Sequence, residues 1–171
     1  MRKKVVRKIC KKHVGTKIKL NTRRKKMDKL QYESIYGYCR VSSDEQAKHG
    51  TSLAEQKKTI TKMSMYLFER EPDGFYVDDG ISGALDFYKR PEGKKLQNVL
   101  EPNDVVLVAK LDRLIRRLSV LCSVRDAFNE TNIHLFAHDI LGGAESISTS
   151  NSPNVNMFVN MMGTFAEWDR E

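Results

Sequence analysis

Apolar residues occur along this chain either in short continuous runs or at helical spacing. The two patterns take turns along the sequence, which predicts strands alternating with helices. Short apolar runs predict four strands, at residues 35–41, 75–77, 104–109 and 132–137. Apolar residues at helical spacing predict the helices, one after residue 52, one from residue 91, one over residues 110–128 and one from residue 153. We therefore expect an α/β fold with a mostly parallel sheet of four to five strands and helices on both faces.

Local signals support this order of elements. Ser52 and Glu55 have the spacing of a capping box, which predicts that a helix begins there. Pro91 and Pro153 each stand where a helix is expected to begin. The run from Asp104 to Ala109 is apolar without alternation, which is typical of a strand buried on both faces. This run is predicted to be the central strand.

The last predicted helix is apolar on two faces. One face carries Val155, Phe158, Val159, Met162 and Phe165, and the other carries Met157, Met161 and Trp168. Two apolar faces predict burial on two sides, either against a second subunit or within a tightly packed monomer. No helix-ending signal precedes the terminal Glu171, so we expect a long helix that is cut off by the end of the chain.

Charge separates the first 31 residues from the rest. The net charge is +8, but residues 1–31 hold 14 Lys or Arg and one acid, so this segment carries +13 and the remainder −5. Such a block predicts a disordered arm that binds polyanions such as DNA, for which Arg23, Arg24, Lys25 and Lys26 are candidate contacts. A nuclear address, an organelle leader and a charged overhang remain as alternatives.

Composition also bounds the compartment and the cofactors. Cys10, Cys39 and Cys122 lack disulfide or zinc-site spacing, which predicts reduced thiols and no metal cofactor. No apolar run reaches the ~18 residues of a membrane span, and the N-terminus lacks the apolar core of a signal peptide. We expect a cytoplasmic protein without a membrane partner, associated with the nucleoid or, in a eukaryotic host, with the nucleus.

A candidate nucleophile follows the first strand. Ser42 stands two residues after Arg40, at a carboxyl edge of the predicted sheet, where open α/β folds place their chemistry. Ser42 with Glu45, and Ser43 with Gln46, also have capping-box spacing, so one of these serines is equally suited to start a helix. Both interpretations stay open at this point.

Two further loops are predicted at the same edge, from Asp78 to Arg90 and from Lys110 to Arg117. Arg113, Arg116 and Arg117 are spaced to share one helical face, with Asp112 beside them. A hydroxyl, several guanidinium groups and a carboxylate suit attack on a phosphodiester, because guanidinium forks match phosphate oxygens. The alternative for the arginines is a solvated helix face, and Asp78 and Asp79 suit either a turn or a metal pair.

Several motifs together resemble the catalytic domain of the serine recombinases, the resolvase and invertase family. They are Tyr36-Gly-Tyr-Cys-Arg-Val-Ser42, Gln46, Gln56, Asp78, Ser82-Gly83, Arg90 and Lys110-Leu-Asp-Arg-Leu-x-Arg116. The resemblance implies site-specific DNA recombination without a metal or other cofactor. It implies that Ser42 forms a 5′-phosphoserine link and that Arg40, Arg113 and Arg116 hold the phosphate. Arg90 and Gln46 would support these arginines. Asp112 would orient the arginines or assist proton transfer. We expect Lys110 and Arg117 to contact DNA.

The resemblance also implies partners and boundaries. It predicts a homodimer that becomes a tetramer in the active synapse, a catalytic domain over residues 32–150 and the start of a long dimerisation helix over residues 151–171. Family members normally continue into a DNA-binding domain, which is not found in this sequence. The alternatives are therefore a shortened recombinase that binds DNA or a partner without chemistry, and an unrelated α/β enzyme acting on a nucleotide or small phosphate.

Overall fold

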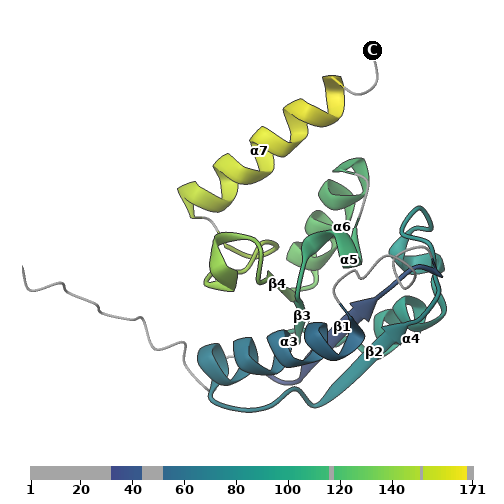
Figure 1. Cartoon of the computed structure of the whole chain (residues 1–171). Helices are drawn as coiled ribbons and strands as arrows, with labels where there is room; N and C mark the ends of the chain where they lie inside the picture. The colour runs from purple at the N-terminus through teal and green to yellow at the C-terminus, as the bar shows by residue number, and fades with distance from the viewer. Residues whose placement is uncertain (1–31, 44–51, 116–117, 151, 169–171) are drawn as a thin grey trace, which may run out of the picture.

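A four-stranded parallel sheet forms the centre of the molecule (Figure 1). The computed structural model describes residues 32–43, 52–115, 118–150 and 152–168. The strands are β1 (Ile35–Arg40), β2 (Gly74–Asp78), β3 (Val105–Val108) and β4 (His134–Ala137), in the spatial order β2-β1-β3-β4. The predicted parallel α/β sheet is confirmed, whereas the basic arm of residues 1–31 lies outside the described residues.

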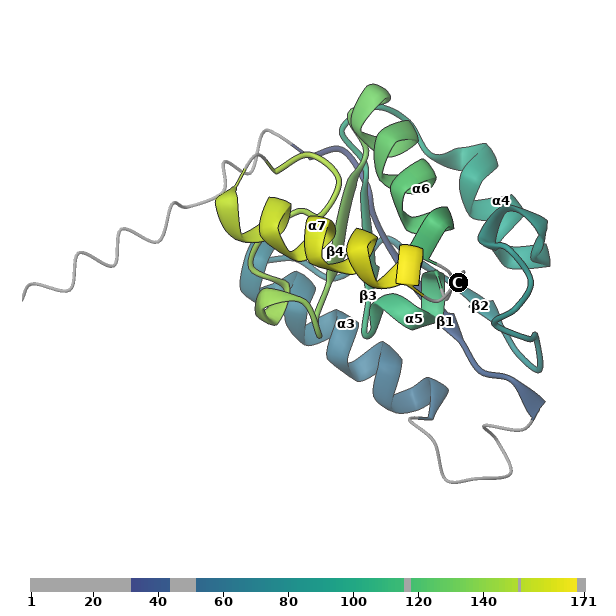
Figure 2. The ribbon, with the colours of Figure 1, turned by 90° about the horizontal axis from the view of Figure 1, so that it is seen from above.

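Helices cover both faces of the sheet (Figure 2). Helix α3 (Leu53–Phe68) packs on one face, and helices α4 (Pro91–Val99) and α6 (Leu118–Glu130) pack on the other. Two separate apolar cores result, one around Ile60 and Phe136 beneath α3 and one around Leu96, Val106 and Leu121 on the opposite side. This is the doubly covered sheet that the uninterrupted apolar runs predict.

The pleat of β1 decides which side its functional residues face. Successive side chains of a strand point to opposite faces. Ile35 and Cys39 accordingly join the core beneath α3, whereas Tyr38 joins the core on the α4 and α6 side. Arg40 is two residues after Tyr38 and therefore shares its face, toward α4 and the chain after β3.

The first helix begins where the capping box predicts. Ser52 is the N-cap of α3, its Oγ accepts the Glu55 amide hydrogen at 3.1 Å, and a Glu55 carboxylate oxygen accepts from the Ser52 amide at 3.0 Å. The helix ends at Glu69, whose φ of 58° places it in the left-handed region. Helices α4 and α7 (Pro153–Trp168) begin at the two predicted prolines.

The single helix predicted over residues 110–128 is wrong. Helix α5 covers only Leu111–Leu114, Ile115 is extended with φ −133° and ψ 120°, and α6 starts at Leu118. The Arg113 carbonyl, which a continuous helix would use internally, accepts Arg90 Nη1 at 2.8 Å. Helix α5 therefore ends one turn after it begins, and the predicted sharing of one helical face by Arg113, Arg116 and Arg117 stays a prediction, because Arg116 and Arg117 lie outside the described residues.

The polar segment after β4 covers the outer edge of that strand. The Ile147 amide donates to the Leu135 carbonyl at 2.7 Å, and Ser148 Oγ accepts from the Leu135 amide at 2.9 Å. Ser148 Oγ also donates to the Ile133 carbonyl at 2.7 Å. These bonds satisfy edge groups of β4 that would otherwise be open to pairing with another chain.

Helix α7 is apolar on the face that it turns to the core and on part of its exposed surface. Val155 and Val159 are buried in the core beside α6, whereas Met157 and Met161 are 66% and 51% exposed. The side chains of Met162, Phe165 and Trp168 are not among those described, so dimerisation through this helix stays a prediction. Within the described ranges, no helix is both long enough and apolar enough to cross a membrane.

Candidate active site

Three strand ends meet at one edge of the sheet, as predicted. β1 lies between β2 and β3, and the register pairs Arg40 with Asp78 and Tyr38 with Val108. The segments that follow these strands are therefore neighbours in space although they are far apart in sequence. This edge carries Arg40, Ser42, Asp78 and the residues of α5.

Ser42 is held close to the end of β2 by its neighbour Val41. The Val41 amide donates to the Asp78 carbonyl at 3.2 Å, and the Val41 carbonyl accepts from the Ile81 amide at 3.1 Å. Ser42 is half-buried, whereas Ser43 is exposed and directs its Oγ toward the Gly80 carbonyl at 3.5 Å. The capping-box alternative stays open, because Glu45 and Gln46 lie outside the described residues.

Arg40 is fixed through its backbone and its guanidinium group. The side-chain amide of Gln56, which is fully buried, accepts from the Arg40 amide at 3.2 Å and donates to the Arg40 carbonyl at 3.0 Å. Arg40 Nη1 donates to the Ile81 carbonyl at 2.9 Å, and the residue is only 2% exposed. A cation is thus held in a protected environment two residues before Ser42, and charge interactions there are stronger than in water.

Arg113 is oriented by its neighbour Asp112. Arg113 Nε and Nη2 donate to the two carboxylate oxygens of Asp112 at 3.0 Å and 2.6 Å, which is a bidentate pair. Arg113 Nη1 donates to the Arg40 carbonyl at 3.4 Å, so the structure brings the two predicted arginines together. Both Asp112 oxygens are engaged, which favours an orienting role over proton transfer.

Arg90 is buried and bonded to protein groups on several sides. Its Nε donates to the Leu85 carbonyl at 2.8 Å, and its Nη1 donates to the Tyr38 hydroxyl at 3.0 Å and to the Arg113 carbonyl at 2.8 Å. With 1% exposure, Arg90 holds the 78–90 segment against α5. This arrangement fits the supporting role that the resemblance implies for Arg90.

Tyr38 and Asp78 continue this buried network. The Tyr38 hydroxyl donates to Asp78 Oδ2 at 2.7 Å, and burial raises the Tyr38 pKa well above its ordinary value. Asp78 also accepts the Glu92 and Gly93 amides at 3.0 Å and 3.2 Å, which caps the start of α4. The Asp78 carboxylate therefore serves the fold, and among the described residues no cluster of three or more His, Cys, Asp or Glu side chains could hold a metal ion.

Two groups that contact site residues were missed from the sequence. Tyr38 joins Asp78 to Arg90, and Asp139 accepts the Leu111 amide at the start of α5, at 3.0 Å. A signal for Asp139 was present, because it comes two residues after the fourth strand and so lies at the same edge as the other three loops. Only three of the four strand ends entered the prediction.

Several predicted site residues lie outside the described part of the chain. Lys110 is described and is exposed at the start of α5, where it can reach a polyanion. The predicted residues outside the described ranges are Gln46, Arg116, Arg117, Arg23, Arg24, Lys25 and Lys26. Their roles stay predictions.

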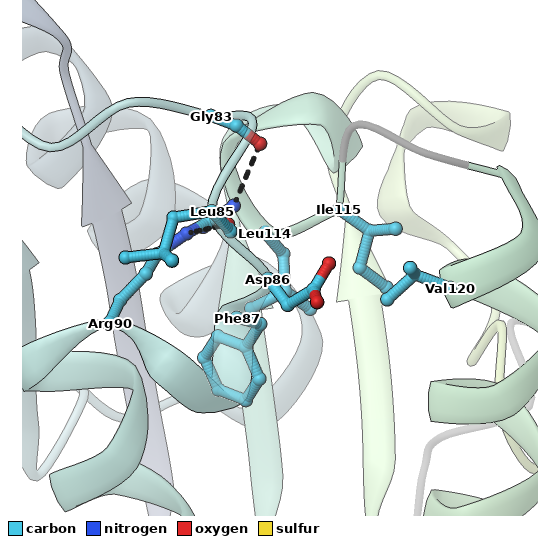
Figure 3. A pocket seen from close by; sticks show the side chains of 8 residues that line it. All are labelled: Gly83, Leu85, Asp86, Phe87, Arg90, Leu114, Ile115 and Val120. Carbon is cyan, nitrogen blue, oxygen red and sulfur yellow. Dashed lines mark hydrogen bonds between the residues drawn. The ribbon is translucent and has the colours of Figure 1, made fainter.

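A shallow pocket adjoins this network (Figure 3). It holds about 170 Å³ of empty space, part of it open to solvent, between the 83–87 segment, Leu114, Ile115 and Val120, with Arg90 at one side. Figure 3 shows the Arg90 guanidinium bonded to the 83–85 backbone. The pocket therefore adjoins the Arg90 guanidinium and the end of α5.

Comparison with known proteins agrees with this geometry. The family model described as "Resolvase, N terminal domain" matches residues 35–171. The transposon Tn21 resolvase of Escherichia coli is 30% identical over 105 residues, covering 60% of this chain and 54% of its own length. The serine recombinase gin of Escherichia phage Mu is 30% identical over 137 residues, covering 80% of this chain and 60% of its own length.

A solved structure shows the same fold. The N-terminal catalytic domain of TP901-1 integrase superposes with a TM-score of 0.59 at 28% identity, covering 81% of this chain and 97% of that one. The chain spans between 54% and 63% of the length of the first curated relatives that it matches. With most of its length matched by the family model, the chain belongs to the resolvase family of serine recombinases.

Proposed function

We propose that this chain carries the catalytic domain of a site-specific DNA recombinase, with Ser42 as its nucleophile. The observation that supports this most is the convergence of Arg40, Ser42 and Arg113 at one edge of the sheet, where Arg113 Nη1 donates to the Arg40 carbonyl. A hydroxyl beside two fixed guanidinium groups suits attack on a phosphodiester better than on a neutral substrate. Residues 32–150 form this domain in the proposal.

The proposed reaction exchanges one phosphodiester for another. Ser42 Oγ attacks the scissile phosphorus and forms a phosphoserine bond as the bond to the 3′-oxygen breaks. The serine proton is lost and the departing 3′-oxygen gains one, so a free 3′-hydroxyl and a 5′-phosphoserine result. The bond energy is kept for rejoining, which proceeds by the reverse attack. No metal or cofactor takes part in the proposed step.

Fixed arginines supply the charge that this reaction needs. Negative charge grows on the non-bridging phosphate oxygens, and one donor aimed at such charge contributes on the order of 10² to 10³ in rate. The bond from Arg113 Nη1 to the Arg40 carbonyl is long, at 3.4 Å, so we expect a phosphate oxygen to replace it. Arg116 joins Arg40 and Arg113 on the phosphate, while Asp112, Arg90 and Gln46 support these groups.

The proposed partners follow from charge and from the exposed helix face. DNA contacts Lys110 and Arg117 near the site and the basic residues of the arm, including Arg23, Arg24, Lys25 and Lys26. The exposed Met157 and Met161 of α7 provide an apolar face for a second copy, and two such dimers form the tetramer in which strands exchange. The cell compartment in this proposal is the cytoplasm, at the nucleoid.

A binding role without chemistry is the second candidate. It is favoured by the buried state of Arg40 and Arg90, whose guanidinium groups donate to the Ile81, Leu85 and Arg113 carbonyls. In that case the chain would pair with DNA or with longer recombinases and leave strand cleavage to them.

A covalent trap separates the two candidates. We would use a suicide duplex, nicked near the cleavage point so that cleavage leaves the protein on the strand, with target sites from a random library or from DNA flanking the gene. The reaction is run in EDTA, and SDS-resistant protein–DNA adducts are counted for the native chain and for Ser42→Ala. The proposal predicts an adduct that Ser42→Ala abolishes.

Ser43→Ala is the matched control, because it removes the neighbouring hydroxyl and should leave the adduct in place. A chain that forms no adduct would be fused after Glu171 to a DNA-binding domain of known site and tested again. Adduct formation by the fusion would support a working active site that needs a DNA-binding domain to reach its target. A second failure would contradict catalysis and favour the binding role.

A further inference from the structure

Helix α5, which carries Arg113, is too short to hold its own position. It spans four residues. The Ile115 amide donates to the Leu111 carbonyl at 2.9 Å, and the Arg113 amide donates to the Lys110 carbonyl at 3.1 Å. A single helical turn is marginal in water, because its nucleus costs more order than its few bonds return. Its position therefore depends on contacts from other elements.

Side chains from outside the helix contact both of its ends. At the last turn, Arg90 Nη1 donates to the Arg113 carbonyl at 2.8 Å. At the first turn, the N-cap Lys110 makes no side-chain cap bond, and Asp139 Oδ1 accepts the Leu111 amide at 3.0 Å instead. Asp139 comes from the segment after β4, 28 residues later in the chain.

The cap repeats an arrangement seen at α4. There Asp78, at the end of β2, accepts the Glu92 and Gly93 amides at the helix start, directly after Arg90. The strands β2 and β4 are the two outer strands of the sheet. A carboxylate at the end of β2 caps α4, which follows Arg90, and a carboxylate just after β4 caps α5, which carries Arg113. A negative group at a helix start also interacts favourably with the helix dipole.

We propose that Asp139 is a positioning residue of the recombinase site, which anchors the start of α5 and thereby places the Arg113 guanidinium beside Arg40. This inference rests on the proposed function of the same site. Asp139 acts through the Leu111 amide and does not touch DNA. Asp112 has the complementary task, since it orients the Arg113 side chain while Asp139 anchors the backbone that carries it.

The surroundings of Asp139 fit an anchoring carboxylate. Desolvation by burial raises the pKa of Asp139 above its ordinary value, and the charge of Asp112 adds to this. The hydrogen bonds from the Leu111 amide and from its own amide, together with the charge of Lys110, oppose the rise in part. The residue is otherwise exposed, so its substitution leaves both apolar cores intact. Loss of function on substitution can then be separated from loss of the fold.

The test compares two substitutions of Asp139 in the full chain. Asp139→Ala removes the acceptor, and Asp139→Asn keeps an oxygen at the same place without the charge. We expect Asp139→Ala to slow adduct formation on the suicide duplex about 10-fold or more, because small displacements of a catalytic group cost this much or more. Asp139→Asn should keep the rate within about threefold of that of the native chain. If the charge of Asp139 were what mattered, this substitution would slow the reaction as much as Asp139→Ala.

Asp73→Ala is the matched control at the opposite edge of the sheet. Asp73 Oδ2 likewise accepts one backbone amide, that of Ile35 at 2.7 Å. We expect Asp73→Ala to lower the unfolding midpoint at least as much as Asp139→Ala but to leave the rate of adduct formation near that of the native chain. Equal slowing by both substitutions would overturn the positioning role, as would a native rate in Asp139→Ala.

Amide and guanidinium NMR signals provide a readout that does not depend on cleavage. If Asp139 anchors α5, Asp139→Ala speeds hydrogen exchange at the Leu111 amide and shifts the Arg113 Nε resonance, and Asp73→Ala changes neither. If neither the native chain nor its fusion forms an adduct, the proposed function fails. The Leu111 exchange rate and the Arg113 Nε resonance still show whether Asp139 anchors α5. Unchanged Leu111 exchange and Arg113 resonance in Asp139→Ala would overturn it.

Discussion

Gln56 connects a fully buried position of α3 to Arg40, the last residue of β1 and two residues before the proposed nucleophile Ser42. Its side-chain amide bonds both the amide and the carbonyl of Arg40, and all of these groups are shielded from water. A buried backbone group left without a partner costs about 1–3 kcal/mol. Gln56 therefore contributes both to stability and to the position of Arg40.

We predict that Gln56→Ala lowers the free energy of unfolding by about 2–5 kcal/mol, because the Arg40 amide loses its acceptor, the Arg40 carbonyl keeps only the long bond from Arg113 Nη1, and a cavity opens. Urea unfolding measures this change. Gln97→Ala, in which an exposed helical glutamine is replaced, is the control and should change stability by less than about 0.5 kcal/mol. Equal effects of the two substitutions would show that the Arg40 contact contributes nothing.

His134 makes stability depend on pH. Its Nδ1 lies 2.7 Å from Thr149 Oγ1, its Nε2 is buried without a hydrogen-bond partner in the described part of the chain, and burial lowers its pKa below the ordinary 6.5. The unfolded chain then binds the proton more readily than the folded one. Stability from this group is complete above about pH 6.5 and is lost as pH falls toward the lowered pKa of the folded state.

We expect the native chain to lose up to about 1.4 kcal/mol of stability per pH unit through His134 between the unfolded and folded pKa values. Unfolding in urea at a series of pH values from about 7.5 to 5 measures the slope. His134→Asn should make the slope shallower, and His138→Asn, an exposed neighbour, should leave it unchanged. An unchanged slope in His134→Asn would contradict the prediction.

At the residue scale, the sequence predicted which residues come together at the ends of neighbouring strands. It did not predict hydrogen bonds between side chains of one element and groups of another. Arg40 and Arg113 were placed together because β1 and β3 end at one edge. Tyr38 was missed because its bond joins residues 40 positions apart, which no local pattern marks. Asp139 was missed although it follows a strand end, because its partner lies 28 positions away. Their recognition requires the register of the sheet.

At the scale of elements, the separation of α5 from α6 is the main difference from the prediction. Leu114, Leu118 and Leu121 have helical spacing, so apolar periodicity alone favours one helix. Tertiary contacts override it, because Arg90 takes the Arg113 carbonyl and Ile115 turns into the core. The break turns α5 into a separate unit that the residues around it can position.

Helix α4 lies against the 87–89 turn at a point where only glycine fits. A Cβ added to Gly93 would lie 2.2 Å from the Phe87 carbonyl oxygen, a backbone atom that cannot move alone. Gly93 also donates its amide to Asp78. The close approach keeps the start of α4, and with it Arg90, near the site.

We predict that Gly93→Ala destabilises the fold by about 1–3 kcal/mol through overpacking and slows adduct formation by displacing Arg90. Thermal unfolding and the suicide-duplex rate measure the two effects. Gly74→Ala is the control, since its added Cβ would meet Tyr36 at an ordinary 3.7 Å. Native stability and rate in Gly93→Ala would refute the close approach.

At the scale of the whole molecule, charge is divided between a basic arm and a nearly balanced body. Residues 1–31 carry +13 and the remaining residues −5, so non-specific affinity for DNA should come mainly from the arm. Each phosphate that a basic residue neutralises adds about −0.9 to the slope of log affinity against log salt.

Replacing Arg23, Arg24, Lys25 and Lys26 together by Gln should make this slope shallower by up to about 3.6, if all four contact phosphates. Binding to a mixed-sequence duplex at several salt concentrations measures the slope. Lys94→Gln with Lys95→Gln, on an exposed face of α4, is the control and should change it little. A native slope in the arm variant would place the DNA contacts elsewhere.

The layered arrangement of the molecule was predictable because its strands and helices differ in apolar period. The capping box at Ser52, the prolines at the starts of α4 and α7 and the uninterrupted apolar strand β3 all agree with the structure. Subunit contacts were not predictable to the same degree, because an exposed apolar helix face such as that of Met157 and Met161 does not identify what covers it.

The most direct test of the central claim is to identify the atom that holds the DNA. The trapped adduct would be digested with nuclease and protease, and the modified peptide sequenced by mass spectrometry, with end-labelled duplexes showing which strand end is free. We predict a nucleotide phosphate on Ser42, joined to the 5′ end, and a free 3′-hydroxyl on the other side of the break. A nucleotide on Ser43 or on another residue, or a link to the 3′ end, would contradict the account.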